Sequence, residues 1–226
     1  MCADDRAPAR GLLGLLDEPV DGAYALEVLA PDFCEALLEA VDGAKADDGA
    51  PLPRANLDVL GASWVADLPL LVGEQVCAVA HPSETLTDAS GERAPLDWRH
   101  AYVLQYTPAG RSSLVHHTDD SELTVNVGLG RDFDGGDLLL GGVRGTPAEA
   151  SSLVDRVGPR RGVAIIHLGR HLHAVDNVSS GERRVLICWC RSLAGVRSQV
   201  CPCCWMNRRA GGASPGDCIC GPVWNA

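Results

Sequence analysis

The chain has 226 residues, of which 46% are hydrophobic and 22% are charged, and its formal net charge at pH 7 is −11. This length suits one well-packed domain with appendages and is short for two. No apolar run approaches the ~20 residues of a membrane-spanning helix, so we expect a soluble chain without a membrane partner. The acidic balance also disfavours nucleic acid as a partner, because phosphate contacts need clustered Lys and Arg side chains.

The N-terminal segment MCADDRAPARGLLGLLDEPVDG has acidic residues beside a short Leu run. A secretory signal peptide would instead carry a basic leader followed by a long apolar stretch. We therefore expect an intracellular protein, in the cytoplasm or the nucleus.

The N-terminal part of the chain predicts one strand and two helices. Residues 17 to 43 indicate a strand and then a helix that starts near Pro31, with Pro at the helix start and apolar residues at helical spacing. Residues 44 to 56 are polar and rich in Pro and Gly, which favours a loop. Residues 65 to 80 repeat apolar side chains every three or four positions, as in a helix that packs on a sheet. A second loop is expected at residues 83 to 94.

The pattern then changes to short β-strands punctuated by turns. The segments are AYVLQY, LVHHTD, LTVNVGL, DLLLGG, GVAIIHLG, HAVDNV and RRVLICWC. Such a series favours a β-sandwich or barrel, and helices that precede strands are expected when helices brace one side of a jelly roll. We predict an α+β fold: an N-terminal helical support region (residues 1–98), a double-stranded β-helix or jelly-roll core (99–195) and a Cys-rich tail (196–226).

Candidate metal ligands lie in two distant segments. His117 and Asp119 are two positions apart, so on a strand both would point to the same face. A His-x-Asp pair arises by chance in many chains, so a third ligand is needed. The candidates in IIHLGRHLHAV are His167, His171 and His173, and strand alternation does not choose among them.

Arg183 favours His173 as the third ligand. The Ser-Ser-Gly between the two residues predicts a turn that would place them on neighbouring antiparallel strands. Two imidazoles and one carboxylate form the facial triad of non-heme Fe(II) oxygenases. The guanidinium of Arg183 suits a planar carboxylate, because it donates two parallel hydrogen bonds and stays charged. Arg184 is expected to point the other way and to face solvent.

Two blocks of sequence carry a family resemblance. They are LVHHTDDSELTVNVGLGRDFDGGDLLLGG and RGVAIIHLGRHLHAVDNVSSGERRVLICWCRS, which combine HxD, F-x-GG, a later His and G-x-R. The chain resembles the 2-oxoglutarate and Fe(II) dioxygenases of the prolyl 4-hydroxylase-like superfamily, and most closely their "oxygenase domain-containing" branch. The resemblance covers most of the chain. It implies Fe(II), 2-oxoglutarate and O2, and hydroxylation of a C–H bond with release of succinate and CO2.

The resemblance also assigns residues, and the iron ligands that it implies are His117, Asp119 and His173. Arg183 matches the residue that holds the distal carboxylate of 2-oxoglutarate, and Tyr106 matches a tyrosine that helps to bind it. Asn126 lies on a strand where such families place a polar cosubstrate contact, and Trp189 matches a tryptophan beside the site. Core packing is the alternative for Asn126 and Trp189.

The tail predicts a second metal site or simple thiol chemistry. Half of the ten cysteines lie in the last 26 residues, namely Cys201, Cys203, Cys204, Cys218 and Cys220. Four thiolates from two short clusters can hold a structural zinc ion, while free thiols and disulfides are the alternatives.

The substrate and two competing functions stay open. The substrate is a protein, a peptide or a small molecule, with peptidyl proline or lysine suggested by kinship alone. Ascorbate is a further candidate cofactor. The first competitor is a cupin-like protein that binds metal or a small acid without oxidation, although such a protein has no need of Arg183. The second is an interaction module with a zinc tail on a degenerate barrel, which the intact ligand set disfavours.

Overall fold

A computed structural model of the chain describes residues 11, 14–44, 54–81, 87–144 and 155–194. Within them the helices are α2 (Pro31–Gly43) and α3 (Ser63–Ala80). The strands are β1 (Asp17–Val20), β2 (Ala23–Glu27), β3 (Arg54–Asn56), β4 (Trp98–Tyr106), β5 (Leu114–His117), β6 (Leu123–Gly130), β7 (Phe133–Gly135), β8 (Leu138–Val143), β9 (Asp155–Val157), β10 (Val163–Leu168), β11 (His171–Val175), β12 (Val178–Gly181) and β13 (Arg183–Arg191).

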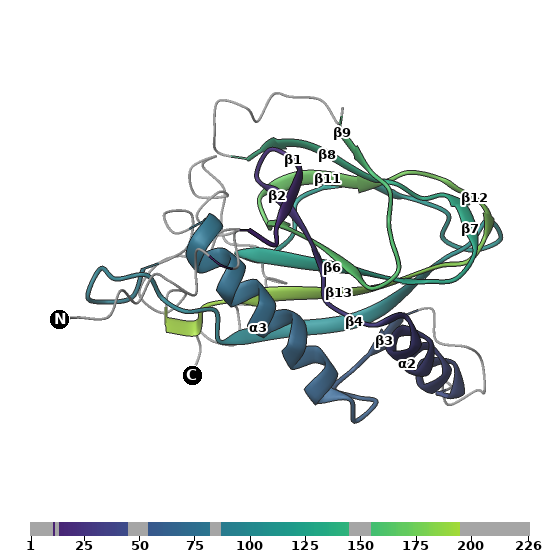
Figure 1. The fold of residues 1–226 in the computed structure, drawn as a ribbon, viewed down its shortest axis with the longest axis horizontal. Helices are drawn as coiled ribbons and strands as arrows, with labels where there is room; N and C mark the ends of the chain where they lie inside the picture. The colour runs from purple at the N-terminus through teal and green to yellow at the C-terminus, as the bar shows by residue number, and fades with distance from the viewer. Residues whose placement is uncertain (1–10, 12–13, 45–53, 82–86, 145–154, 195–226) are drawn as a thin grey trace, which may run out of the picture.

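The strands form two facing layers. The major sheet has seven strands in the order β1-β2-β10-β6-β13-β4-β3, and the minor sheet has four in the order β5-β11-β8-β9. Strands β7 and β12 pair with each other at one end. Figure 1 shows the minor sheet above the major sheet, with both helices on the face of the major sheet that is turned away from the minor sheet. Helix α3 contacts β4, β6 and β13, and α2 contacts β6.

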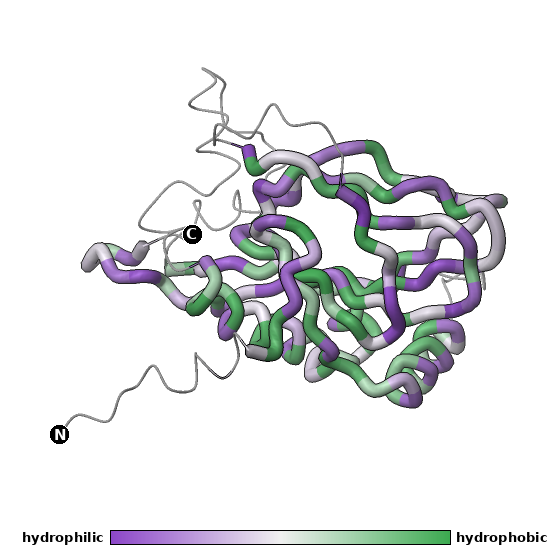
Figure 2. The backbone as a smooth tube through the Cα atoms, turned by 45° about the horizontal axis from the view of Figure 1, so that its top comes forward, coloured by the Kyte–Doolittle hydropathy of each residue, from purple (hydrophilic) through white to green (hydrophobic). Residues whose placement is uncertain are grey.

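Strand alternation gives the major sheet two different buried faces. On β13, Leu186, Cys188 and Cys190 belong to the core that includes both helices. Val185 and Ile187 belong instead to a core shared with Val175 of β11 on the minor sheet. The outward face of the minor sheet is partly exposed: β8 alternates buried and half-buried residues, and hydrophobic and hydrophilic stretches mix along the strands of this layer in Figure 2. Side chains of both sheets thus line the space between them.

The predicted elements agree with the structure in most places. The helices expected near Pro31 and over residues 65–80 are α2 and α3. The prediction of a loop at residues 44–56 is wrong for its last three residues, because residues 54–56 form β3 and pair with β4. The N-terminal region therefore supplies three strands of the major sheet as well as both helices, and the role of the helices as a brace stays a prediction.

Helix α3 is long and apolar enough to cross a membrane by length and composition, the only such helix among the described residues. Core helices of globular proteins pass the same test, and α3 buries Val65, Ala66, Val76 and Cys77 against the major sheet.

Gly162 permits a close approach between β10 and the segment that leads into α2. Its φ is +77°, and a Cβ atom there would lie 2.1 Å from the Leu29 carbonyl oxygen. The Gly162 carbonyl accepts hydrogen bonds from the backbone N–H groups of Val28 and Leu29, at 2.9 and 3.1 Å. Only glycine satisfies both the backbone angle and the contact.

We predict that Gly162→Ala destabilises the fold by about 3 kcal/mol, because it combines an unfavourable φ with a backbone clash. Gly61→Ala is the matched control: its φ is +72° with nothing within 4 Å of the added Cβ, so it should cost only about 1 kcal/mol. Urea unfolding measures both. Equal losses in the two variants would contradict the role of the Gly162 contact.

Candidate metal centre

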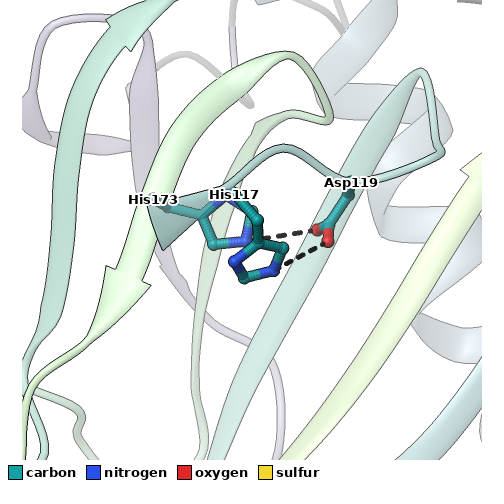
Figure 3. Close-up of side chains that lie close together, drawn as sticks. All are labelled: His117, Asp119 and His173. Atoms are coloured by element: carbon teal, nitrogen blue, oxygen red, sulfur yellow. Dashed lines mark ion pairs between the residues drawn. The ribbon is translucent and has the colours of Figure 1, made fainter. Parts of the chain in front are cut away.

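Three side chains from the predicted triad converge between the two sheets. His117 ends β5, and His173 lies directly opposite it on β11. Their ring centroids are 4.3 Å apart. The Nε2 atoms of His117 and His173 each lie 3.5 Å from an oxygen of Asp119. Figure 3 shows both rings pointing toward this carboxylate. The three ligand atoms lie within 4.8 Å of one another, so they could hold one metal ion.

Asp119 reaches this point from a turn and not from the strand that was predicted. Strand β5 ends at His117, so alternation along it does not orient Asp119. The backbone N–H of Asp119 donates to the Gly169 carbonyl at 2.8 Å. The Thr124 hydroxyl donates to Asp119 Oδ2 at 2.6 Å. These two hydrogen bonds fix the carboxylate relative to β6 and the β10–β11 turn.

The two imidazoles present the nitrogen atoms that a metal needs. His117 Nδ1 lies 2.8 Å from the Val115 carbonyl, and His173 Nδ1 lies 2.8 Å from the His171 carbonyl. A carbonyl only accepts hydrogen bonds, so each Nδ1 carries a proton, and each Nε2 is the nitrogen that lies near Asp119 and is available to a metal. Hydrogen bonds of this kind orient the histidine ligands of metal sites.

The protonation states of Asp119 and His173 also suit a divalent cation. Burial disfavours the charged form of Asp119, but the hydrogen bond with His117 and the neighbouring His173 and His167 outweigh it and hold the pKa of Asp119 at about 2. Burial lowers the pKa of His173. Asp119 is therefore an anion and His173 is neutral, as metal ligands must be.

Arg183 is a buried cation with unused donors. Only 1% of the residue is exposed. Its Nε and Nη1 atoms have no hydrogen-bond partner among the described residues. Its guanidinium lies 5.0 Å from the centroid of the Tyr106 ring, which is also buried. Burial lowers the pKa of Arg183, and the Tyr106 hydroxyl opposes this shift. Two free donors on a buried guanidinium match a planar carboxylate.

The reason given for pairing His173 with Arg183 was wrong. His173 is on β11 of the minor sheet and Arg183 is on β13 of the major sheet, so the two residues lie on different sheets and not on neighbouring strands. The turn between them, including β12, pairs with β7 instead. Arg184 does not face solvent as predicted: it is 6% exposed and forms ion pairs with Asp42 and Glu182.

The other histidine candidates lie around the triad. His171 Nε2 donates to the Gly141 carbonyl at 2.8 Å, so this nitrogen is not available to a metal. His167 lies on β10, in the other sheet from His173, with ring centroids 4.7 Å apart. Its Nε2 is buried and has no partner among the described residues. Sequence parity could not separate these residues, because they lie on two strands in two sheets.

The remaining predicted site residues have mixed outcomes. Asn126 is buried on β6, opposite Ile187 of β13. Trp189 lies beside Tyr102, with ring centroids 5.7 Å apart. The cosubstrate role of Asn126 stays a prediction. The predicted zinc ligands lie outside the described residues, namely Cys201, Cys203, Cys204, Cys218 and Cys220.

Comparisons with known proteins agree with this geometry. No protein-family model matches the chain. The chain is 32% identical over 212 residues to the 2-oxoglutarate and iron-dependent oxygenase domain-containing protein 2 of Danio rerio, covering 90% of this chain and 59% of the relative. It is 32% identical over 209 residues to the protein of the same name in Homo sapiens, covering 88% and 57%. The chain thus spans less than two thirds of these relatives.

The fold has a counterpart among solved structures. A prolyl hydroxylase of Trichoplax adhaerens, solved with a hypoxia inducible factor peptide fragment, aligns with a TM-score of 0.55. The alignment covers 85% of this chain and 94% of that one at 12% identity. This likeness confirms the predicted jelly-roll core. The chain is a jelly-roll protein with a cluster of side chains that could hold a metal ion. It is a homologue of the 2-oxoglutarate and iron-dependent oxygenase domain-containing proteins, which confirms the resemblance found in the sequence.

We predict that His173→Ala weakens the binding of Co(II), which is used as an air-stable substitute for Fe(II). Mutation of a residue that only hydrogen-bonds to a metal ligand weakens metal binding roughly 10–100-fold, and loss of the ligand itself should weaken it more. His116→Ala, at an exposed neighbour of His117, should bind Co(II) like the wild type. Isothermal titration calorimetry measures both affinities. Unchanged affinity in His173→Ala would remove this residue from the metal centre.

Proposed function

We propose that the chain is an Fe(II)- and 2-oxoglutarate-dependent oxygenase that hydroxylates a C–H bond of a protein or peptide, with release of succinate and CO2. The observation that carries the proposal is the combination of the converged His117, Asp119 and His173 with the unused donors of Arg183. A protein that only stores metal gains nothing from a buried, unpaired guanidinium. Its burial is costly unless an anion completes it.

The residues of the chain divide the work of binding and orientation. Iron held by the triad, together with 2-oxoglutarate, would supply the oxidation that no amino-acid side chain performs. Arg183 would hold the distal carboxylate of 2-oxoglutarate, and the Tyr106 hydroxyl, which interacts with the same guanidinium, would help to position it. The 2-oxoglutarate would then lie between the two sheets, bound from the major sheet by Arg183 and from the triad side through the metal.

The surroundings of Arg183 exclude water. Its guanidinium lies 5.0 Å from the centroid of the Tyr106 ring, and Tyr106 belongs to a core with Leu104, Val178 and Val185, all buried. An ion pair in such an environment is stronger than the same pair at the surface. The pairing with Arg183 would therefore favour a dicarboxylic acid, whose second carboxylate can reach the guanidinium, over a monocarboxylic one.

The relatives guide the choice of substrate class. The Trichoplax structure is a prolyl hydroxylase with a peptide bound, which supports a protein or peptide substrate here. Ascorbate as an auxiliary cofactor and zinc in the Cys-rich tail remain predictions, as does an intracellular location.

Purified protein supplied with Fe(II) and 2-oxoglutarate should release succinate, and His173→Ala should not. Arg183→Ala should raise the KM for 2-oxoglutarate by roughly 30-fold or more, because a buried charge pair is lost, while its Co(II) affinity stays unchanged. Arg160→Ala, at an exposed arginine between β9 and β10, is the control. Succinate release that is equal in wild type and His173→Ala, or an unchanged KM in Arg183→Ala, would contradict the proposal.

A further inference from the structure

A cluster of four side chains lies on the inner face of the major sheet, at the β3 edge. The Arg54 guanidinium lies 3.7 Å from the centroid of the Tyr102 ring. Arg54 Nη2 is 2.9 Å from His100 Nε2. The centroid of the His100 ring is 5.2 Å from that of Tyr102 and 5.9 Å from that of Trp189. Strand register places all four on the face that looks toward the minor sheet.

Arg54 is held in place but is not neutralised. Arg54 donates to His100 Nε2, so that nitrogen carries a lone pair. Burial and the nearby Arg54 both lower the pKa of His100, so this histidine is neutral at pH 7. No carboxylate among the described residues forms an ion pair with Arg54. Asp58 is the acid that faces His100, and both of its oxygens bond to Arg99.

This arrangement selects an anion. Aromatic clusters commonly bind cations on the ring faces. Here the protein's own guanidinium already covers the Tyr102 ring, so a ligand cation would meet a positive charge. Arg111 adds a second positive charge near Tyr102. The guanidinium of Arg54 is exposed on one side and can pair with an incoming carboxylate.

Trp189 supplies a separate indication that this surface binds a ligand. Its Nε1 atom is buried and has no hydrogen-bond partner among the described residues. An indole N–H is a donor only, and a buried donor without a partner is costly. A backbone carbonyl of a bound peptide would satisfy it.

The cluster lies close enough to the metal centre for one bound peptide to contact both. Trp189 lies opposite Thr124, whose hydroxyl bonds to Asp119. Arg54 is on β3, but its guanidinium lies over the ring of Tyr102 on β4, two strand steps from β6. Two steps are about 10 Å at ~4.8 Å per step. An extended peptide covers this distance in about three residues at ~3.3 Å each. A small dicarboxylic acid is too short to reach both points.

We propose that Arg54, held by Tyr102 and His100, is the subsite for an acidic side chain of a peptide substrate, about three residues from the residue that is hydroxylated. This inference rests on the proposed oxygenase function and narrows its substrate class to acidic peptides.

The test uses binding, so that it does not depend on turnover. Fluorescent nonapeptide pools have a fixed proline or lysine at the centre. In each pool, one of the remaining positions is fixed as Asp, Ala or Lys, and the pools together scan every position. Their affinity for the full chain with Co(II) and 2-oxoglutarate is measured by fluorescence anisotropy, and succinate is measured in parallel with Fe(II). The variants are Arg54→Glu and, as a control of equal charge change at an exposed arginine, Arg160→Glu.

The wild type and Arg160→Glu should bind pools with Asp two to four residues from the centre about fivefold more tightly than pools with Ala. Arg54→Glu should lose this preference and favour Lys at the same positions. No preference for Asp at any position in either pool, or the same preference in Arg54→Glu, would overturn the subsite. A preference for Asp with no succinate formed from any pool would support the subsite and overturn the oxygenase function.

Discussion

The site depends on the pairing of β5 with β11. This pairing places His117 directly opposite His173 in the minor sheet, and the two Nε2 atoms converge because each Nδ1 is bonded to a backbone carbonyl two residues away. A slip of one residue in this register would turn one imidazole to the other face of the sheet. The carboxylate of Asp119 is then added from the turn, fixed by Thr124 and by the backbone of Gly169.

The second constraint is the two-sided packing of the major sheet. One face of β13 anchors the helices through Leu186, Cys188 and Cys190. The other face carries Arg183 and Trp189, beside Tyr106 and Tyr102 respectively. Burial is what suits Arg183 to bind an anion. An exposed arginine would donate hydrogen bonds to water, whereas two donors of the buried Arg183 have no partner among the described residues. The anionic cosubstrate and the acidic peptide would thus both be bound from the major sheet, while His117 and His173 would hold the metal from the minor sheet.

Local sequence patterns predicted much of this structure. Periodicity gave both helices and the principal strands, because their apolar faces are buried against one sheet or between two. The residues of the triad were also found from the sequence. Their geometry was not: Asp119 lies in a turn, and His173 and Arg183 lie on opposite sheets. Which strands share a sheet is set by long-range pairing, which strand alternation does not encode. Arg184 was misassigned because its partner Asp42 is distant in sequence, on α2. The Arg54 cluster was missed because β3 is short and follows a segment rich in Pro and Gly.

Anomalous X-ray diffraction from crystals grown with Co(II) and 2-oxoglutarate would locate both the metal and the cosubstrate. We expect a single strong metal peak bonded to His117 Nε2, His173 Nε2 and a carboxylate oxygen of Asp119, with the distal carboxylate of 2-oxoglutarate on Arg183. A metal peak away from these three side chains, or a 2-oxoglutarate molecule that leaves Arg183 unpaired, would contradict the proposed function.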